Sequence, residues 1–168
     1  MPKKKPGDSK PLDPLDVGRR LEKLLSGQIT SAIEQLNAPE SSLTAFRMTL
    51  NAVRCDKTTV NKHFYPESAI RKIMELLNFR QFVIGLGEEA FRPSTMEPVY
   101  PGFTFPGTAK INRFGFIEVD TMLTPEYAAR LRENSSCMLT GPVGTAVLDE
   151  KHTVIEYYLL GIHISERL

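Results

Sequence analysis

The spacing of hydrophobic positions changes along the chain, from a helical period in the first half to a strand-like pattern in the last third. Apolar residues recur at intervals of three and four over 17–36, 43–53 and 69–77, which is the period of an amphipathic helix. The third segment is preceded by a proline and a glutamate, which are common in the first turn of a helix. The pattern therefore predicts three helices within residues 16–91.

The last third of the chain has the pattern of an antiparallel β-hairpin. Two segments rich in β-branched and aromatic residues, Thr145–Leu148 and Thr153–Ile164, flank the polar tetrapeptide Asp149–His152. A further strand is predicted over Ile111–Asp120, with Gly115 as a bulge or a point of close approach. Because a two-stranded hairpin is only marginally stable alone, the rest of the chain must cover one of its faces.

A proline-rich segment, residues 92–108, separates the two halves and predicts an irregular connection. A fourth helix is expected from Thr124 to Asn134, because threonine, proline and glutamate follow one another at its start. The segment between Asn78 and the proline-rich connection is ambiguous, since so short an apolar run fits a strand or the end of a helix.

These elements predict an α+β fold, in which an N-terminal helical bundle is followed by a small antiparallel sheet that ends in the C-terminal β-hairpin. A strand so close to the C-terminus is expected to form a sheet edge, and exposed edges recruit other chains. The predicted organisation is a disordered basic tail over 1–15, then a single domain over 16–168 with a helical half (16–91), a proline-rich connection (92–108) and a β-rich half (109–168).

Composition limits the class of protein. The chain has 168 residues, of which 41% are hydrophobic and 24% charged, and it has no apolar run of about 18 residues that would suit a membrane span. Its first residues lack the apolar region of a secretory signal, so we expect a cytoplasmic or nuclear protein, or a virion component, and not a secreted one. Cys55 and Cys137 are then expected to be free thiols.

The net charge of +1 argues against a uniformly basic nucleic-acid-binding protein, but the first ten residues are locally cationic. Lys3, Lys4, Lys5 and Lys10 lie among prolines that prevent a helix. We expect these four lysines to bind a polyanion, either nucleic acid or an acidic lipid surface. The alternative is a terminus that only increases solubility.

Two glycine motifs resemble nucleotide-binding loops without completing them. The segment from Gly85 to Ala90 fits G-x-G-x-x-A, but two acidic residues lie in it and Pro93 follows too soon for a long helix. The segment from Met138 to Thr145 begins like a phosphate-binding loop and lacks the lysine that such a loop needs. We interpret the first as a turn and the second as a turn before a strand.

Catalytic and metal-binding residues are not indicated by spacing. The three histidines and two cysteines show no metal-ligand pattern, so we predict no metal and no cofactor. A pairing of Cys137 with His152 or His163 stays open, as does a carboxylate pair of Glu118 and Glu156 on neighbouring strands. Bases stacking on the sheet would need aromatic residues interleaved with cations, and apart from one arginine, at position 113, the β-rich half is short of cations.

The pattern as a whole favours a non-catalytic structural or assembly protein that forms homo-oligomers and holds a polyanion with its basic tail. Small viral matrix, nucleocapsid and capsid-associated proteins share this general build, which is an analogy of architecture only. The alternatives are an adaptor that binds a partner peptide on its helical half, and a small enzyme with a cysteine, histidine or glutamate site. Self-association predicts a mass that rises with concentration.

Overall fold

Nine β-strands, two α-helices and one 3-10 turn form the part of the chain that the computed structural model describes, residues 43–92 and 98–166. The main sheet contains β1 (Thr44–Leu50), β4 (Val83–Leu86), β5 (Gly102–Thr104), β6 (Lys110–Ile111), β7 (Ile117–Leu123), β8 (Met138–Leu148) and β9 (Val154–Glu166). A small second sheet pairs β2 (Lys57–Thr58) with β3 (Phe64–Tyr65). The helical elements are α2 (Glu67–Phe79), α3 (Pro125–Glu133) and the 3-10 turn η2 (Glu88–Phe91).

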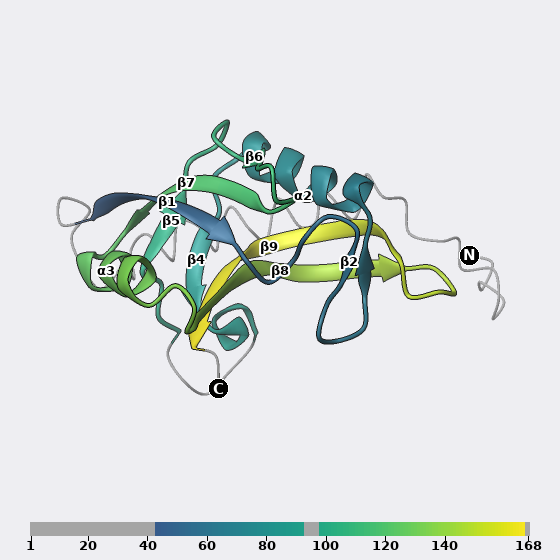
Figure 1. Cartoon of the computed structure of the whole chain (residues 1–168). Coiled ribbons are helices and arrows are strands. Elements are labelled where there is room, and N and C mark those ends of the chain that lie inside the picture. Colours follow the sequence, from purple (N-terminus) through teal and green to yellow (C-terminus); the bar gives the residue numbers. More distant parts are fainter. Residues whose placement is uncertain (1–42, 93–97, 167–168) are drawn as a thin grey trace, which may run out of the picture.

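The main sheet is mixed and curls until its two outer strands meet (Figure 1). The strand order is β1-β7-β5-β4-β9-β8, with β6 also paired to β7. Every neighbouring pair is antiparallel except β4 and β9, which run parallel. The ends of β1 and β8 are joined just after β1, where the Ala52 N–H donates to the Thr140 carbonyl at 2.9 Å and the Asn51 side chain bonds the backbone of β8.

The predicted N-terminal helical bundle is wrong. Its first helix lies outside the described residues, and its second is strand β1, which pairs with β7 along its whole length from Thr44 opposite Leu123 to Leu50 opposite Ile117. The segment fits both periods, but burial alternates along it, with Met48 and Leu50 buried and the residue between them exposed. The segment forms a strand because its continuous pairing over seven residues outweighs the helical spacing of a few apolar positions.

The small antiparallel sheet was also predicted with the wrong strand order. The strand expected over residues 111–120 is divided into β6, a turn and β7, and β5 and β4 lie between β7 and the hairpin. The last strand, β9, is not the outermost strand of the sheet, since β8 pairs with one side along its length and β4 pairs with the other side from Ile162 to Ile164. Among the described residues, a strand edge without a partner lies instead at residues 143–148, the outer half of β8.

Three predicted elements are confirmed. Helix α2 forms where expected and buries one stripe of its surface against the sheet, comprising Ala69, Ile70, Ile73 and Leu77. Helix α3 begins with Pro125 in its first turn and ends at Glu133. The hairpin β8–β9 is longer than predicted, and its turn is held by Asp149 Oδ1, which accepts from the N–H groups of Lys151 and Thr153 at 2.8 and 3.0 Å.

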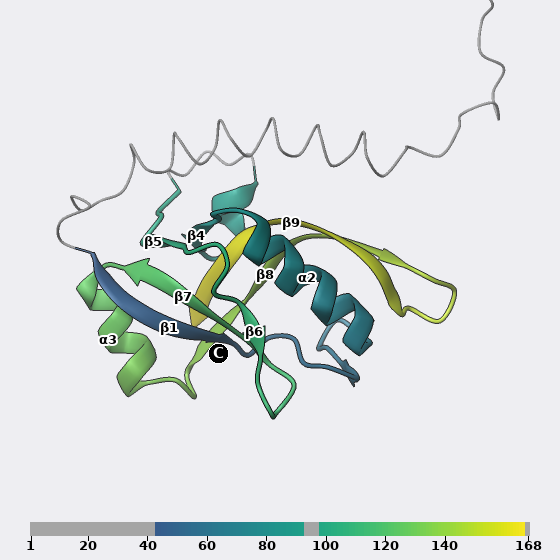
Figure 2. The same ribbon diagram turned by 90° about the horizontal axis from the view of Figure 1, so that it is seen from above.

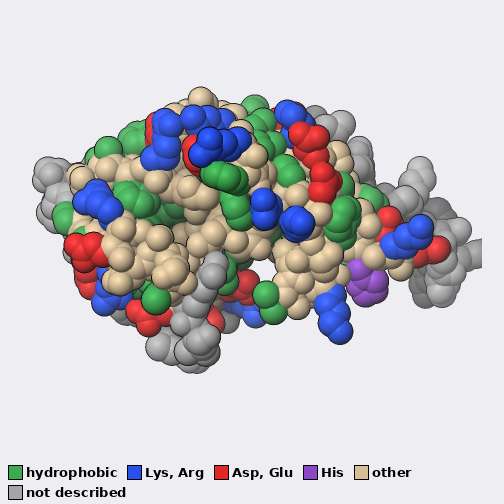
Figure 3. All heavy atoms as spheres, viewed as in Figure 1, with side chains coloured by type: hydrophobic (Ala, Val, Ile, Leu, Met, Phe, Trp, Pro, Cys, Tyr) green, Lys and Arg blue, Asp and Glu red, His purple; other side chains and the backbone are tan. Residues whose placement is uncertain are grey.

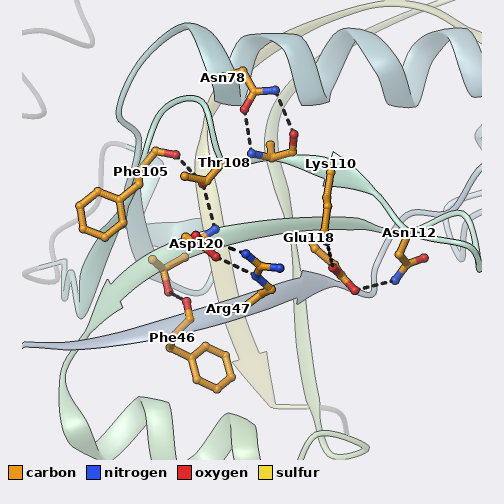
Figure 4. Close-up of polar contacts among 11 residues, drawn as sticks. Phe46, Arg47, Asn78, Phe105, Thr108, Lys110, Asn112, Glu118 and Asp120 are labelled. Atoms are coloured by element: carbon orange, nitrogen blue, oxygen red, sulfur yellow. Dashed lines mark hydrogen bonds and ion pairs between the residues drawn. The ribbon is translucent and has the colours of Figure 1, made fainter.

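Part of the proline-rich connection forms β5, whose three buried residues lie between β4 and β7. Polar contacts fix the segment that follows it, as Figure 4 shows. The Asn78 side chain bonds both the N–H and the carbonyl of Ala109, at 2.7 and 3.0 Å, and so ties α2 to this segment. Thr108 Oγ1 accepts from the Asp120 N–H at 3.0 Å, and the Asp120 carboxylate pairs with Arg47 at 2.8 Å.

The core lies between α2 and the inner face of the curled sheet, with α3 packed near β1 at the other end of the molecule (Figures 1 and 2). Its largest fully buried side chains come from β1, α2, β4, β7, β9 and the segment before β4. Within residues 43–92 and 98–166, no helix combines the length and apolarity that crossing a membrane would require.

Candidate functional site

Two adjoining cavities form a continuous depression beside the outer half of β8, which we call the β8 groove. The larger has a volume of about 490 Å³ and the smaller of about 330 Å³. Four residues line both cavities: Asn61, Tyr65, Glu88 and Pro142. The groove therefore brings together the small β2–β3 sheet, the η2 turn and the hairpin, which are distant in sequence.

The edge of β8, and not one of its faces, forms the floor of the groove. Five consecutive residues, 142–146, line the larger cavity. Side chains of a strand alternate between its two faces, so a run of consecutive lining residues means that the backbone edge borders the cavity. Strand β9 contributes Tyr157 and Leu160 to this larger cavity.

This edge carries no strand partner among the described residues. From Val143 to Leu148, β8 pairs with β9 on its inner side, and no described backbone group bonds to its outer side. The same six residues include no charged side chain, and Val147 is exposed over 36% of its surface. Natural proteins usually protect such edges with charged residues, proline or bulges. Residues 143–148 contain no charged residue and no proline, but Pro142 directly precedes them and the pairing register shifts after Val143 and after Val147, so only a short edge is open.

One wall of the groove is the β2–β3 sheet with the turn that joins its strands. Asn61, His63 and Tyr65 line the larger cavity from this wall. The wall is attached to the tip of the main hairpin, because the Phe64 N–H donates to the His152 carbonyl at 2.9 Å. The turn itself closes through a 2.8 Å bond from the Thr59 N–H to the His63 carbonyl.

The opposite wall is the η2 turn, which presents Glu88 and Arg92 to the groove. These two side chains form an ion pair at 3.4 Å, and both are largely exposed. The turn is held by Phe91, whose ring lies against Gly85 of β4 and Gly161 of β9. A Cβ atom at Gly85 would lie 2.8 Å from that ring, so a side chain at this position would displace η2.

Buried tyrosines give the groove neutral hydroxyl groups. Burial raises the pKa of Tyr65, and burial raises the pKa of Tyr157 further, with smaller contributions from the neighbouring Tyr65 and Glu88. The two rings lie 6.4 Å apart between centroids. Both groups therefore stay protonated at neutral pH and offer hydroxyl groups for hydrogen bonding, and neither serves as a base.

His163 lines the smaller cavity and is almost fully buried, at 5% exposure. Its Nδ1 lies 3.2 Å from Ser165 Oγ, and its neighbours across the sheet are Gly85 and Gly141. Burial lowers the pKa of His163, and the nearby charges of Glu88 and Glu89 only partly oppose that effect.

The stability of the protein should therefore depend on this histidine below neutral pH. Because the folded-state pKa is lower than the value of about 6.5 in the unfolded chain, the unfolded chain binds more protons. The free energy of unfolding should fall as the pH drops below about 6.5, and His163→Gln should remove that part of the slope. Urea unfolding between pH 7.5 and 5.5 measures this, with His152→Asn as the control, since the exposed His152 at φ +61° suits asparagine.

The structure separates most of the sequence-predicted catalytic candidates. Cys137 lies exposed at the start of β8, whereas His152 lies in the hairpin turn at the other end of that strand. Glu156 pairs with Lys72 at 2.9 Å, and Glu118 lies on β7, which is not a neighbour of β9. Of these residues only His163 reaches the groove. The predicted polyanion site of Lys3, Lys4, Lys5 and Lys10 lies outside the described residues.

The two glycine motifs are structural. Gly85 is a strand residue beneath Phe91, and Gly87 adopts φ +72° in the turn between β4 and η2. Gly141 lies inside β8, so the turn expected before this strand is wrong. The sequence analysis missed the groove residues Glu88, Arg92 and His63, because their proximity depends on a strand order that no local pattern reveals.

Neither a metal cluster nor a recognisable relative defines the site further. Within the described ranges, no three histidine, cysteine or acidic side chains gather closely enough to hold a metal ion. Both cysteines are free thiols. Comparison with protein-family models, with curated proteins and with solved structures found no match for the chain.

Proposed function

We propose that this chain is a non-catalytic assembly protein, which joins copies of itself by adding the β8 strand of a second copy to the open edge in the β8 groove. The observation that carries the proposal is the run of five consecutive edge residues, 142–146, along the cavity floor. Strand addition of this kind gains affinity from main-chain hydrogen bonds, and neighbouring pockets receive alternate side chains.

The charge distribution favours a second copy as the occupant. The described residues carry thirteen lysines and arginines and thirteen aspartates and glutamates, so two copies do not repel one another strongly. Figure 3 shows both signs intermixed over one face. The groove wall carries one acid and one base, Glu88 and Arg92, which pair with each other at 3.4 Å, so this wall adds no net charge that would repel a second copy.

The predicted polyanion contact of Lys3, Lys4, Lys5 and Lys10 completes this proposal, in which the chain would work as a small viral matrix, nucleocapsid or capsid-associated protein does. On this reading the assembled copies work in the cytoplasm, the nucleus or a virion. A polyanion held by several copies at once gains affinity by multivalency.

Replacing Thr145 by lysine should weaken self-association at least about tenfold, because the added strand would cover an ammonium group at an uncharged edge. Thr145 is exposed, so the fold itself should tolerate the change. Thr58→Lys is the matched control, since Thr58 is an exposed strand threonine that lines neither cavity of the groove. Light scattering over a hundredfold range of concentration measures the mass of each variant.

A mass that stays at 18.9 kDa at every concentration for the unchanged protein contradicts the proposal. Equal dissociation constants for Thr145→Lys and the unchanged protein also contradict it, because they place the interface elsewhere. If the unchanged protein is monomeric and Thr145→Lys alone loses binding to a foreign peptide, the groove belongs to an adaptor.

A further inference from the structure

The turn between β6 and β7 combines exposed aromatic and cationic side chains on a rigid support. It stands out from the sheet in Figure 2. Asn112 holds it from within, because its Oδ1 accepts from the N–H groups of Phe114 and Phe116 at 2.9 and 3.1 Å. Gly115 adopts φ +86°, where its missing side chain also leaves room for Cys55. The turn is therefore ordered before any ligand arrives.

Two arginines from different parts of the chain lie on the phenylalanine rings of this turn. The guanidinium of Arg113 lies 4.7 Å from the centroid of the Phe114 ring, and that of Arg54 lies 5.2 Å from the Phe116 ring. Arg54 also donates from Nε to the Phe114 carbonyl at 2.6 Å. We call these four residues the basic-aromatic turn: Arg54, Arg113, Phe114 and Phe116.

The charges of this turn are not neutralised by neighbours. Neither Arg54 nor Arg113 has an acidic group within 4 Å in the described part of the chain, whereas Arg47, Arg71, Arg92 and Arg130 all do. The acid at the base of the turn, Glu118, is already engaged by Asn112 at 3.1 Å and by Lys110 at 3.8 Å (Figure 4). The Nε atom of Arg54 is used in the turn, so its two terminal nitrogens remain to bind an anion.

Phe114 is exposed over 54% of its surface, although such a ring is usually covered. An exposed aromatic ring flanked by arginines is the arrangement that binds single-stranded nucleic acid, where bases stack on the ring and guanidinium groups hold phosphates. We propose that the basic-aromatic turn binds single-stranded nucleic acid in this way. This site is separate from the lysines of the first ten residues and from the β8 groove.

Insertion into a lipid surface fits the geometry less well. A guanidinium lies directly on each ring, so burying the rings among acyl chains would bring two charges with them. A stacked base, in contrast, leaves both guanidinium groups in water next to the phosphates. A single strand of nucleic acid can therefore stack a base on the ring and pair its phosphates with the guanidinium groups at the same time.

The test measures binding of the full chain to a fluorescein-labelled oligouridine of twelve nucleotides by fluorescence anisotropy. Phe114→Ala should weaken binding at least about fivefold, because it removes one stacking platform. Phe79→Ala is the matched control, since Phe79 is 72% exposed at the end of α2, and it should change the affinity less than about twofold. Phe114→Trp should retain binding, whereas Phe114→Leu, which is apolar without a ring, should lose it.

The two arginines of the turn should contribute to the salt dependence of oligonucleotide binding. Changing both Arg54 and Arg113 to glutamine should reduce the slope of log affinity against log salt by about 1.4, which corresponds to two phosphate contacts to a single strand. Arg132→Gln is the control, because Arg132 is exposed, lies 6.0 Å from the Phe46 ring and belongs to α3, outside the basic-aromatic turn. Thermal unfolding of each variant verifies that the turn variants remain folded.

Three results would overturn this proposal. The first is equal affinity for Phe114→Ala and Phe79→Ala. The second is that changing Lys3, Lys4 and Lys5 to glutamine abolishes all binding to the oligonucleotide while the turn variants have no effect. The third is binding to phosphatidylserine vesicles that depends on Phe114 and tolerates Phe114→Leu. Repeating the anisotropy assay with Thr145→Lys separates binding of nucleic acid at the turn from any effect of self-association.

Discussion

Replacing Asn51 by alanine should lower the free energy of unfolding by about 2–4 kcal/mol, because this side chain joins the two outer strands of the curled sheet. Its Nδ2 donates to the Met138 carbonyl at 2.9 Å, and its Oδ1 accepts from the Thr140 N–H at 2.9 Å. Met138 and Thr140 are buried, at 4% and 1% exposure. Alanine would leave a buried donor and a buried acceptor without partners, and each unmade bond costs about 1–3 kcal/mol.

Asn134→Ala provides the control for this measurement. Asn134 is exposed after α3, so its replacement should change the free energy of unfolding by less than about 0.5 kcal/mol. Urea unfolding followed by circular dichroism gives both values. A loss below about 1 kcal/mol for Asn51→Ala would mean that water replaces both bonds and that the meeting of β1 with β8 contributes little to stability.

Strand β1, which this junction ties to β8, also shows why the fold class was predicted wrongly. Local signals were sufficient for α2, α3 and the hairpin, because proline and acidic residues at helix starts and polar residues in turns act within a few positions. Strand β1 has no such signal, since its apolar residues fit a period of two or of 3.6. Its identity as a strand depends on β7, about seventy residues later in the chain.

The candidate sites were hidden for a related reason. The sequence contains Arg113, Phe114 and Phe116 within four positions, and these alone looked short of positive charge. The second arginine, Arg54, comes from the segment before β2 and reaches the turn only because the Cys55 N–H donates to the Gly115 carbonyl at 2.9 Å. A cluster that depends on a long-range contact cannot be identified from spacing.

The β8 groove depends in turn on the parallel pairing of β4 with β9. Pairing of β4 with β9 places Gly85 beside His163 and brings the η2 turn over Gly161. A ring can lie flat on two adjacent strands where both lack side chains. The two glycines therefore help to determine where Glu88 and Arg92 lie, since the Phe91 ring packs on both of them. The Gly87 N–H also ties the turn to the sheet through a 2.9 Å bond to the Ile164 carbonyl.

Gly161→Ala should therefore cost about 2–3 kcal/mol in the free energy of unfolding, because the added Cβ would lie 2.6 Å from Phe91 Cζ and 2.8 Å from the Val83 carbonyl oxygen. The cost should fall by at least about 1 kcal/mol in a Phe91→Ala background, since the ring is then absent. Urea unfolding of the two single variants and the double variant measures this coupling. Additive costs would show that Phe91 does not rest on Gly161. The displaced η2 turn also carries one wall of the groove. Gly161→Ala should therefore weaken self-association of the folded protein, seen as a smaller rise of its mass with concentration, whereas a loss of stability alone would leave that rise unchanged.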